Sequence, residues 1–157
     1  MGYREMLKDL REKNMQIKNL EKEVVEMAKS IFSEFCREIF ENCESLQSFS
    51  WNQYTPYFND GDSCIFSANT DYIKVNGDYI YDCEWFLEEY VTSFSSSAKE
   101  KTVVANPSYD RNLSDAAMRI QDLLGSLPDS FYEEEFGDHT EITVSREGIE
   151  VEDYQHE

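Results

Sequence analysis

The sequence predicts an α+β fold, in which a long N-terminal helix and two or three shorter helices pack on a mostly antiparallel sheet. First, no Gly or Pro interrupts the chain between Tyr3 and Ser45. Second, the apolar period changes after Leu46 from that of a helix to strand-like alternation. Third, 40% of the 157 residues are hydrophobic, which supplies enough apolar surface for one core.

The first helix is predicted by its apolar spacing. Apolar residues recur every three or four positions from Leu10 to Cys43, which indicates an amphipathic helix of roughly ten turns. Its first half also carries a heptad-like seam that is broken at Lys13. Two arrangements are open for this half. It packs on the body of its own chain, or it projects and pairs with a partner or with a second copy in a homodimer through residues 1–45.

Residues 46–81 are predicted to form an antiparallel meander of three or four strands. The stretch Asn59-Asp60-Gly61-Asp62 supplies a turn, and Asn76-Gly77 is the strongest hairpin signal in the chain. Tyr79-Ile80-Tyr81 is then the return strand.

Residues 83–94 are predicted to form a helix, because Phe86, Tyr90 and Phe94 repeat at a spacing of four. The segment from Ser95 to Asn112 is predicted to be a loop.

Two helices and a hairpin are predicted to complete the chain. One helix has its buried line from Leu113 to Leu127, and Pro128 opens a short acidic helix over Asp129–Phe136 that Gly137 ends. The hairpin pairs residues 139–144 with 149–154. The side chains expected to face inward are Ile142, Val144, Ile149 and Val151, and those expected outside are Glu141, Glu150 and Glu152.

The charge is unevenly distributed. The formal net charge is −19, from 33 acidic and 14 basic residues. Residues 1–30, the near-neutral half of a helix, hold 7 basic and 6 acidic side chains, so residues 31–157, predicted to be a single acidic domain, carry the whole excess. Such a charge excludes direct binding to nucleic acid or to an anionic membrane. With no signal peptide or transmembrane stretch in the sequence, we expect a cytoplasmic protein.

No catalytic motif is present, and we expect a protein that is not an enzyme and has no catalytic residues, no cofactor and no metal. Two features leave an ion site open. The oxygen-rich turn Asn59–Asp62 resembles part of a calcium loop but lacks the spacing of an EF-hand. His139 and His156 would lie close together in the final hairpin, where a surface divalent ion or two solvated imidazoles are the alternatives.

The acidic surface is the feature that folding explains least, because self-repulsion destabilises the compact state. Residues 122–157 hold 12 acids and one base, Arg146. The acids have three readings: they maintain solubility or reflect a salt-adapted host, they bind a basic protein surface, or they mimic DNA phosphates in the channel of a nucleic-acid-binding enzyme. The candidate partner-binding residues are Glu133, Glu134, Glu135, Asp138, Glu141, Glu150, Glu152 and Asp153.

An aromatic run supplies a second candidate site. Trp51, Tyr54 and Tyr57 lie at strand alternation beside a turn. They form either part of an aromatic core or a groove for a ligand or partner, since Tyr and Trp serve both purposes.

Two parts of the sequence are distinctive: W-x-Q-Y-T-P-Y-F-N-D-G-D at residues 51–62, and Phe136-Gly137-Asp138-His139 with the strand after Gly148. They resemble a family of small proteins from bacteriophages, prophages and bacterial genomes. The resemblance implies a phage-linked source and carries no activity. By analogy it implies an inhibitor of a nucleic-acid-binding host or defence protein, like an anti-restriction or anti-CRISPR factor, acting in the host cytosol. The alternatives are an oligomeric scaffold assembled through the N-terminal helix and, less favoured, a metal-dependent enzyme.

Overall fold

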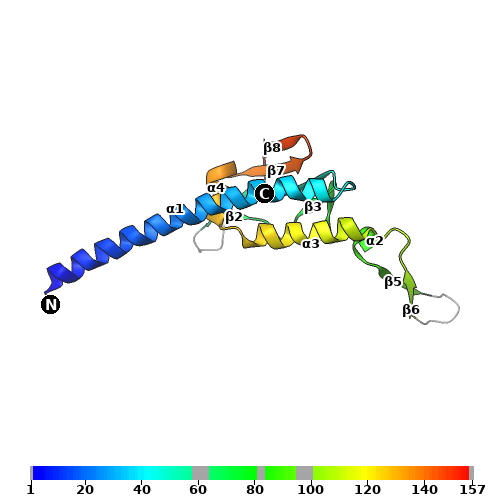
Figure 1. Cartoon of the computed structure of the whole chain (residues 1–157), viewed down its shortest axis with the longest axis horizontal. Helices are drawn as coiled ribbons and strands as arrows, with labels where there is room; N and C mark the ends of the chain where they lie inside the picture. Colours follow the sequence, from blue (N-terminus) through cyan, green and yellow to red (C-terminus); the bar gives the residue numbers. More distant parts are fainter. Residues whose placement is uncertain (1, 58–63, 81–83, 95–100, 156–157) are drawn as a thin grey trace.

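The computed structural model describes residues 2–57, 64–80, 84–94 and 101–155. The predicted α+β class is confirmed (Figure 1). In chain order the elements are α1 (Tyr3–Asn42), β1 (Ser48–Tyr54), β2 (Ser67–Ala68), β3 (Lys74–Val75), β4 (Asp78–Tyr79), α2 (Glu84–Leu87), β5 (Tyr90–Phe94), β6 (Lys101–Ala105), α3 (Arg111–Ser126), α4 (Asp129–Phe136), β7 (Thr140–Ser145) and β8 (Gly148–Asp153).

The main sheet is antiparallel and has the strand order β4-β3-β1-β7-β8, with β2 also paired to β1. β3 pairs with the first half of β1 and β2 with its second half, so both lie on the same side of β1. The predicted simple meander over residues 46–81 is therefore wrong in its connections. β1 is a buried central strand that needs partners on both sides, and its other partner, β7, comes from the far end of the chain.

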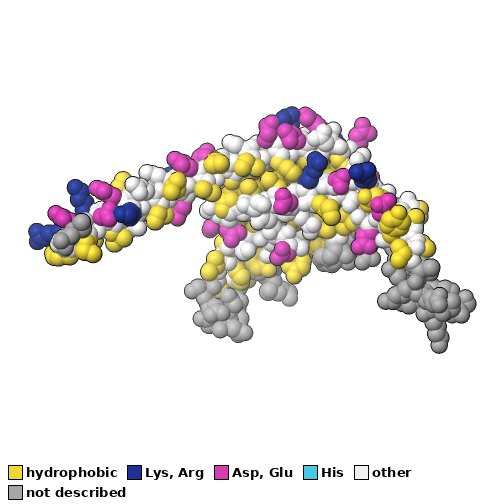
Figure 2. Space-filling view, turned by 60° about the horizontal axis from the view of Figure 1, so that its bottom comes forward, with side chains coloured by type: hydrophobic (Ala, Val, Ile, Leu, Met, Phe, Trp, Pro, Cys, Tyr) yellow, Lys and Arg dark blue, Asp and Glu magenta, His cyan; other side chains and the backbone are white. Residues whose placement is uncertain are grey.

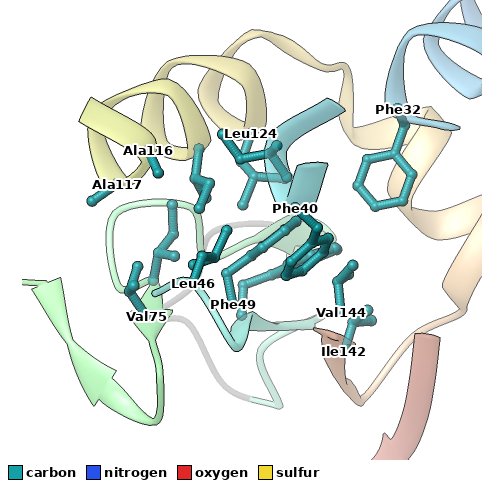
Figure 3. Packing of buried hydrophobic residues seen from close by; sticks show 14 of the residues in the cluster. Phe32, Phe40, Leu46, Phe49, Val75, Ala116, Ala117, Leu124, Ile142 and Val144 are labelled. Carbon is teal, nitrogen blue, oxygen red and sulfur yellow. The ribbon is translucent and has the colours of Figure 1, made fainter. Parts of the chain in front are cut away.

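The core lies between the sheet and the helices. Figure 3 shows side chains from the helices and the strands converging on one cluster. Phe32 of α1 makes an edge contact with Trp51 of β1, with ring centroids 6.1 Å apart, and also packs against Phe131 and Phe136 around α4. Aromatic pairs of this geometry add stability beyond the area that they bury. The C-terminal half of α1 is thus fixed to the body by aromatic packing.

The N-terminal half of α1 projects away from the body (Figure 1). Every residue from Gly2 to Val24 is exposed, and Val25 is the first buried residue of the helix. The arrangement in which this half packs on the body of its own chain is therefore wrong. A helix of 40 residues is about 60 Å long, which exceeds what the sheet can cover.

The predicted helix over residues 83–94 is wrong beyond Leu87. α2 ends there, and Tyr90–Phe94 forms β5, which pairs with β6. The predicted loop over residues 95–112 is wrong over the strand Lys101–Ala105 and at the start of α3, and its residues 95–100 lie outside the described residues. β-branched residues such as Val91 and Val103 favour extended backbone, and this preference outweighs the four-residue aromatic spacing.

The final hairpin is confirmed, but its second strand is exposed. Ile142 and Val144 of β7 are buried as predicted, whereas Ile149 and Val151 of β8 are 48% and 47% exposed. β8 is the edge strand of the sheet, so its inward side chains are only partly covered. Of the described residues, none form a helix with the length and hydropathy that crossing a membrane would take.

Candidate functional site

One face of the main sheet is turned away from the helices and gathers acidic and aromatic side chains. Alternation along β1 sends Trp51 to the core and its neighbours Asn52 and Tyr54 to the other side. Pairing then places Glu141 beside Asn52 and Glu152 beside Glu141 on that same side. We call this surface the outer sheet face, formed by Asn52, Tyr54, Lys74, Tyr79, Glu141, Thr143, Glu150, Glu152 and Tyr154.

The acids of the outer sheet face repel each other. Glu141 and Glu152 are direct cross-strand partners, and Glu150 lies diagonally across from Glu141. Like charges at opposite positions on neighbouring strands destabilise a sheet. Lys74 lies close to this group, with its Nζ 3.9 Å from a carboxylate oxygen of Glu141 and 4.9 Å from the centre of the Tyr79 ring. One cation beside three carboxylates leaves the face acidic.

Two tyrosines lie beside these carboxylates. The rings of Tyr54 and Tyr154 stack with centroids 5.7 Å apart and planes 28° apart. Burial raises the pKa of Tyr154, and the nearby Tyr54, Tyr79 and Glu141 raise it further, so its phenol is neutral at physiological pH. Aromatic faces attract cations, and carboxylates form paired hydrogen bonds with guanidinium groups. The chemistry of the outer sheet face therefore suits Arg and Lys side chains.

The other predicted acids lie elsewhere. Glu133, Glu134 and Glu135 are exposed on α4, where Glu134 pairs with Lys29 of α1 at 3.3 Å. Asp153 points to the opposite side of β8 from Glu152, because successive side chains of a strand alternate. Of the eight predicted partner-binding residues, the structure thus brings together Glu141, Glu150 and Glu152 on one surface.

Asp138 has a structural role. Its carboxylate accepts hydrogen bonds from the backbone N–H and the hydroxyl of Thr55, both at 2.7 Å, and from the backbone N–H of His139 at 2.9 Å. Desolvation pushes the pKa of Asp138 upward, but the hydrogen bonds from Thr55 and His139 outweigh it and hold the pKa below its usual value. Asp138 thereby joins the end of β1 to the segment that leads into β7.

Replacing Asp138 by Asn should lower the free energy of unfolding at pH 7 by about 1 kcal/mol, because the amide accepts fewer of these bonds. Since the folded pKa lies below the unfolded one, this stabilisation is present above pH about 4 and disappears as the pH falls through the folded pKa. Urea unfolding at pH 7 and pH 3 should therefore give a difference from wild type that shrinks at low pH. Asp71→Asn, at an exposed turn, is the control, and a difference that does not change with pH would contradict the role of the carboxylate.

The three aromatic residues predicted for a groove do not line a common one. Trp51 is 2% exposed and its indole N–H donates to Gln53 Oε1 at 3.0 Å. Tyr54 lies on the outer sheet face, and Tyr57, which is 68% exposed, stacks on the His139 ring at 5.0 Å. Trp51 is therefore part of the core, and Tyr54 contributes to a different surface.

The features that left an ion site open lie partly outside the described residues. Asn59–Asp62 and His156 belong to the segments that the structure does not describe. Across residues 2–57, 64–80, 84–94 and 101–155, three or more His, Cys, Asp or Glu side chains do not gather in a way that could hold a metal ion. His139 lies 3.7 Å from Asp138, which is occupied by the hydrogen bonds described above.

Comparison with known proteins gives no relatives. No protein family model matches the sequence, and no curated protein and no solved structure matches it. The phage-linked source suggested by the motif at residues 51–62 stays a prediction. The outer sheet face is therefore the feature from which a function can be inferred.

Proposed function

We propose that the protein is a non-enzymatic binding protein whose outer sheet face engages a basic surface of another protein. The observation that carries the proposal is the cross-strand pair of carboxylates, Glu141 and Glu152, with Glu150 beside them and stacked tyrosines at their edge. This arrangement costs folding stability, so folding alone does not account for it. A partner that inserts Arg or Lys side chains would convert the repulsion into attraction.

We further propose that the partner is a nucleic-acid-binding protein, in which the carboxylates occupy the site of phosphates. Proteins that bind nucleic acid concentrate Lys and Arg on one surface to neutralise phosphates. Carboxylates at alternate positions of a strand, such as Glu150 and Glu152, repeat about every 6.6 Å and present a row of negative charge. The net charge of −19 also steers the protein towards a strongly basic partner. Inhibition of the partner would follow from exclusion of its nucleic acid.

The double variant Glu150→Gln/Glu152→Gln should bind a fluorescently labelled oligo-arginine peptide about fivefold more weakly than wild type, since two surface ion pairs contribute about 0.5 kcal/mol each. The free energy of unfolding of the same variant should be about 0.5 kcal/mol higher than that of wild type, because the substitutions remove the repulsion from Glu141. Fluorescence anisotropy measures the first effect and urea unfolding the second. Weaker binding with higher stability separates a binding role from a folding role.

Glu88→Gln/Glu89→Gln is the matched control, because it removes the same charge from exposed positions between α2 and β5. Its binding should remain within twofold of wild type. Binding of wild type should also fall steeply between low salt and several hundred millimolar salt. Equal binding by both double variants would mean that the acids act only through net charge or by protecting the edge strand from aggregation.

The identity of the partner is tested separately. Wild type and Glu150→Gln/Glu152→Gln are used as baits in extracts of the native host, and co-purifying proteins are identified by mass spectrometry. A protein that binds the wild-type bait but not the variant bait should dissociate from wild type when duplex DNA or RNA is added, because the bait and the nucleic acid compete for one basic surface. A retained partner that binds nucleic acid and the protein simultaneously would contradict phosphate mimicry while leaving the basic-surface proposal intact.

A further inference from the structure

α1 carries an apolar seam that the described part of the chain leaves uncovered. The seam follows the a and d positions of four consecutive heptads from Tyr3 to Ile31, and Lys13 is its one polar member. Its apolar side chains are between 46% and 72% exposed. The a positions are Tyr3, Leu10, Ile17, Val24 and Ile31.

The seam is distinct from the side of α1 that packs on the body. Val25, Ala28 and Phe32 face the core, and each follows a seam residue by one position along the helix. One residue is a rotation of about 100°, so the seam lies to the side of the body and remains open through Ile31. Figure 2 shows hydrophobic side chains along the projecting arm and onto the body.

The charge of the arm indicates what could cover the seam. Residues 1–30 are close to neutral, with 7 basic and 6 acidic side chains, whereas the rest of the chain carries the acidic excess. Two copies would repel each other through their bodies and can approach through their arms. A period of 3.5 residues over four heptads is typical of pairing with another helix that has the same period. We propose that two copies of the chain form an antiparallel coiled coil through Tyr3–Met27.

Lys13 favours the antiparallel orientation. In a parallel pair the d positions of both helices meet, so the two Lys13 ammonium groups would face each other in the seam. In an antiparallel pair a positions meet d positions, which places Lys13 opposite Ile17 and Leu10 opposite Leu20 of the second copy. Lys13 is also bonded to Asp9 of its own helix at 2.7 Å, which neutralises it. The antiparallel pair places the two acidic bodies at opposite ends of a coil about 37 Å long.

Light scattering on the full chain tests the pairing. Wild type should have about twice the 18.4 kDa of one chain, and Leu10→Glu/Leu20→Glu should be monomeric, with a dimer dissociation constant raised at least a hundredfold. Both leucines are exposed, so circular dichroism of the body should not change. Lys8→Gln/Lys22→Gln changes the net charge equally at positions away from the seam, and it should stay dimeric. A monomeric wild type, a dimeric Leu10→Glu/Leu20→Glu or a monomeric control would overturn the proposal.

Disulfide trapping tests the orientation. Under mild oxidation, Leu10→Cys/Leu20→Cys should give a covalent dimer on a non-reducing gel, because these positions meet across an antiparallel seam. Leu10→Cys alone should give no more dimer than wild type, which serves as the blank for the native cysteines. Efficient cross-linking by Leu10→Cys alone would overturn the antiparallel arrangement. These results do not depend on the outer sheet face, so the two proposals can fail separately.

Discussion

Replacing Gln53 by Leu is expected to lower the free energy of unfolding by about 3–5 kcal/mol. Gln53 is fully buried in the core. Its Nε2 donates to the carbonyl oxygens of Tyr132 at 2.8 Å and Gly137 at 2.7 Å, and its Oε1 accepts from the Trp51 indole N–H. Leucine fills a similar volume but removes all three bonds and leaves the Trp51 indole N–H without a partner away from water, whereas the Gly137 carbonyl still accepts from the Thr140 hydroxyl at 3.1 Å. An unsatisfied buried group costs about 1–3 kcal/mol, and each further lost hydrogen bond costs about 1 kcal/mol.

The position of Gln53 in the fold explains why this loss cannot be relieved locally. The side chain connects β1 to both ends of the last turn of α4. Trp51, whose indole N–H donates to Gln53, is itself enclosed by aromatic rings. Water would have to enter an aromatic core to replace the lost bonds, which is unfavourable. The amide network therefore holds α4 in register with the sheet.

Urea unfolding followed by tryptophan fluorescence measures this effect. Gln155→Leu, at an exposed position after β8, is the matched control and should change stability by less than about 0.5 kcal/mol. Gln53→Glu keeps an acceptor for Trp51 but points a buried charge at two carbonyls, and it should be at least as destabilising at pH 7. A loss below about 1 kcal/mol for Gln53→Leu would mean that the hydrogen bonds contribute little.

The elements that the sequence predicted best are those whose signals are local. α4 spans the predicted residues Asp129–Phe136, because Pro128 precedes it and Gly137, with φ of +88°, adopts a conformation that few other residues tolerate. The final hairpin and the first helix are likewise specified by alternation or spacing within a short stretch. By contrast, β5 is stabilised by pairing with β6, which the sequence of β5 does not show. The four-residue spacing of its aromatic residues therefore predicts a helix there, which is wrong.

The same distinction applies to the outer sheet face. Alternation within β7 and β8 was enough to predict that Glu141, Glu150 and Glu152 share one side. Tyr54 and Lys74 could not be placed beside them, because the pairing of β1 with β7 joins segments about ninety residues apart. That register depends on packing of the whole core, which no local pattern encodes. The burial of Gln53 also has no local signal, since a polar residue in a strand gives no sign that it will be buried.

Arg146, the one basic residue among residues 122–157, is another residue whose role depends on distant contacts. It lies in the turn between β7 and β8, and its guanidinium donates to the carbonyl oxygens of Phe40, Cys43 and Leu46. These carbonyls lie at and just beyond the end of α1, where helical partners run out and the helix dipole is negative. α1 has no basic residue in its own last turn. Arg146 therefore supplies the positive charge that this helix end lacks.

Replacing Arg146 by Ala should lower the free energy of unfolding by about 3 kcal/mol, because three carbonyls lose a charged donor and the Phe40 ring loses the guanidinium that lies 5.6 Å from its centre. Arg146→Lys should recover less than half of the loss, since an ammonium group cannot reach three divergent carbonyls with a planar fork. Urea unfolding measures both, with Arg119→Lys at an exposed position of α3 as the control.

The geometry also predicts where the damage from Arg146→Ala appears. Amide hydrogen exchange should accelerate at the end of α1 and in the β7–β8 turn, which Arg146 joins across more than a hundred positions of sequence. Exchange in β5 and β6, which pair only with each other within the described residues, should not change. Full recovery of stability by Arg146→Lys would show that charge at the helix end is sufficient, and would contradict a role for the three-fold hydrogen bonding of the guanidinium.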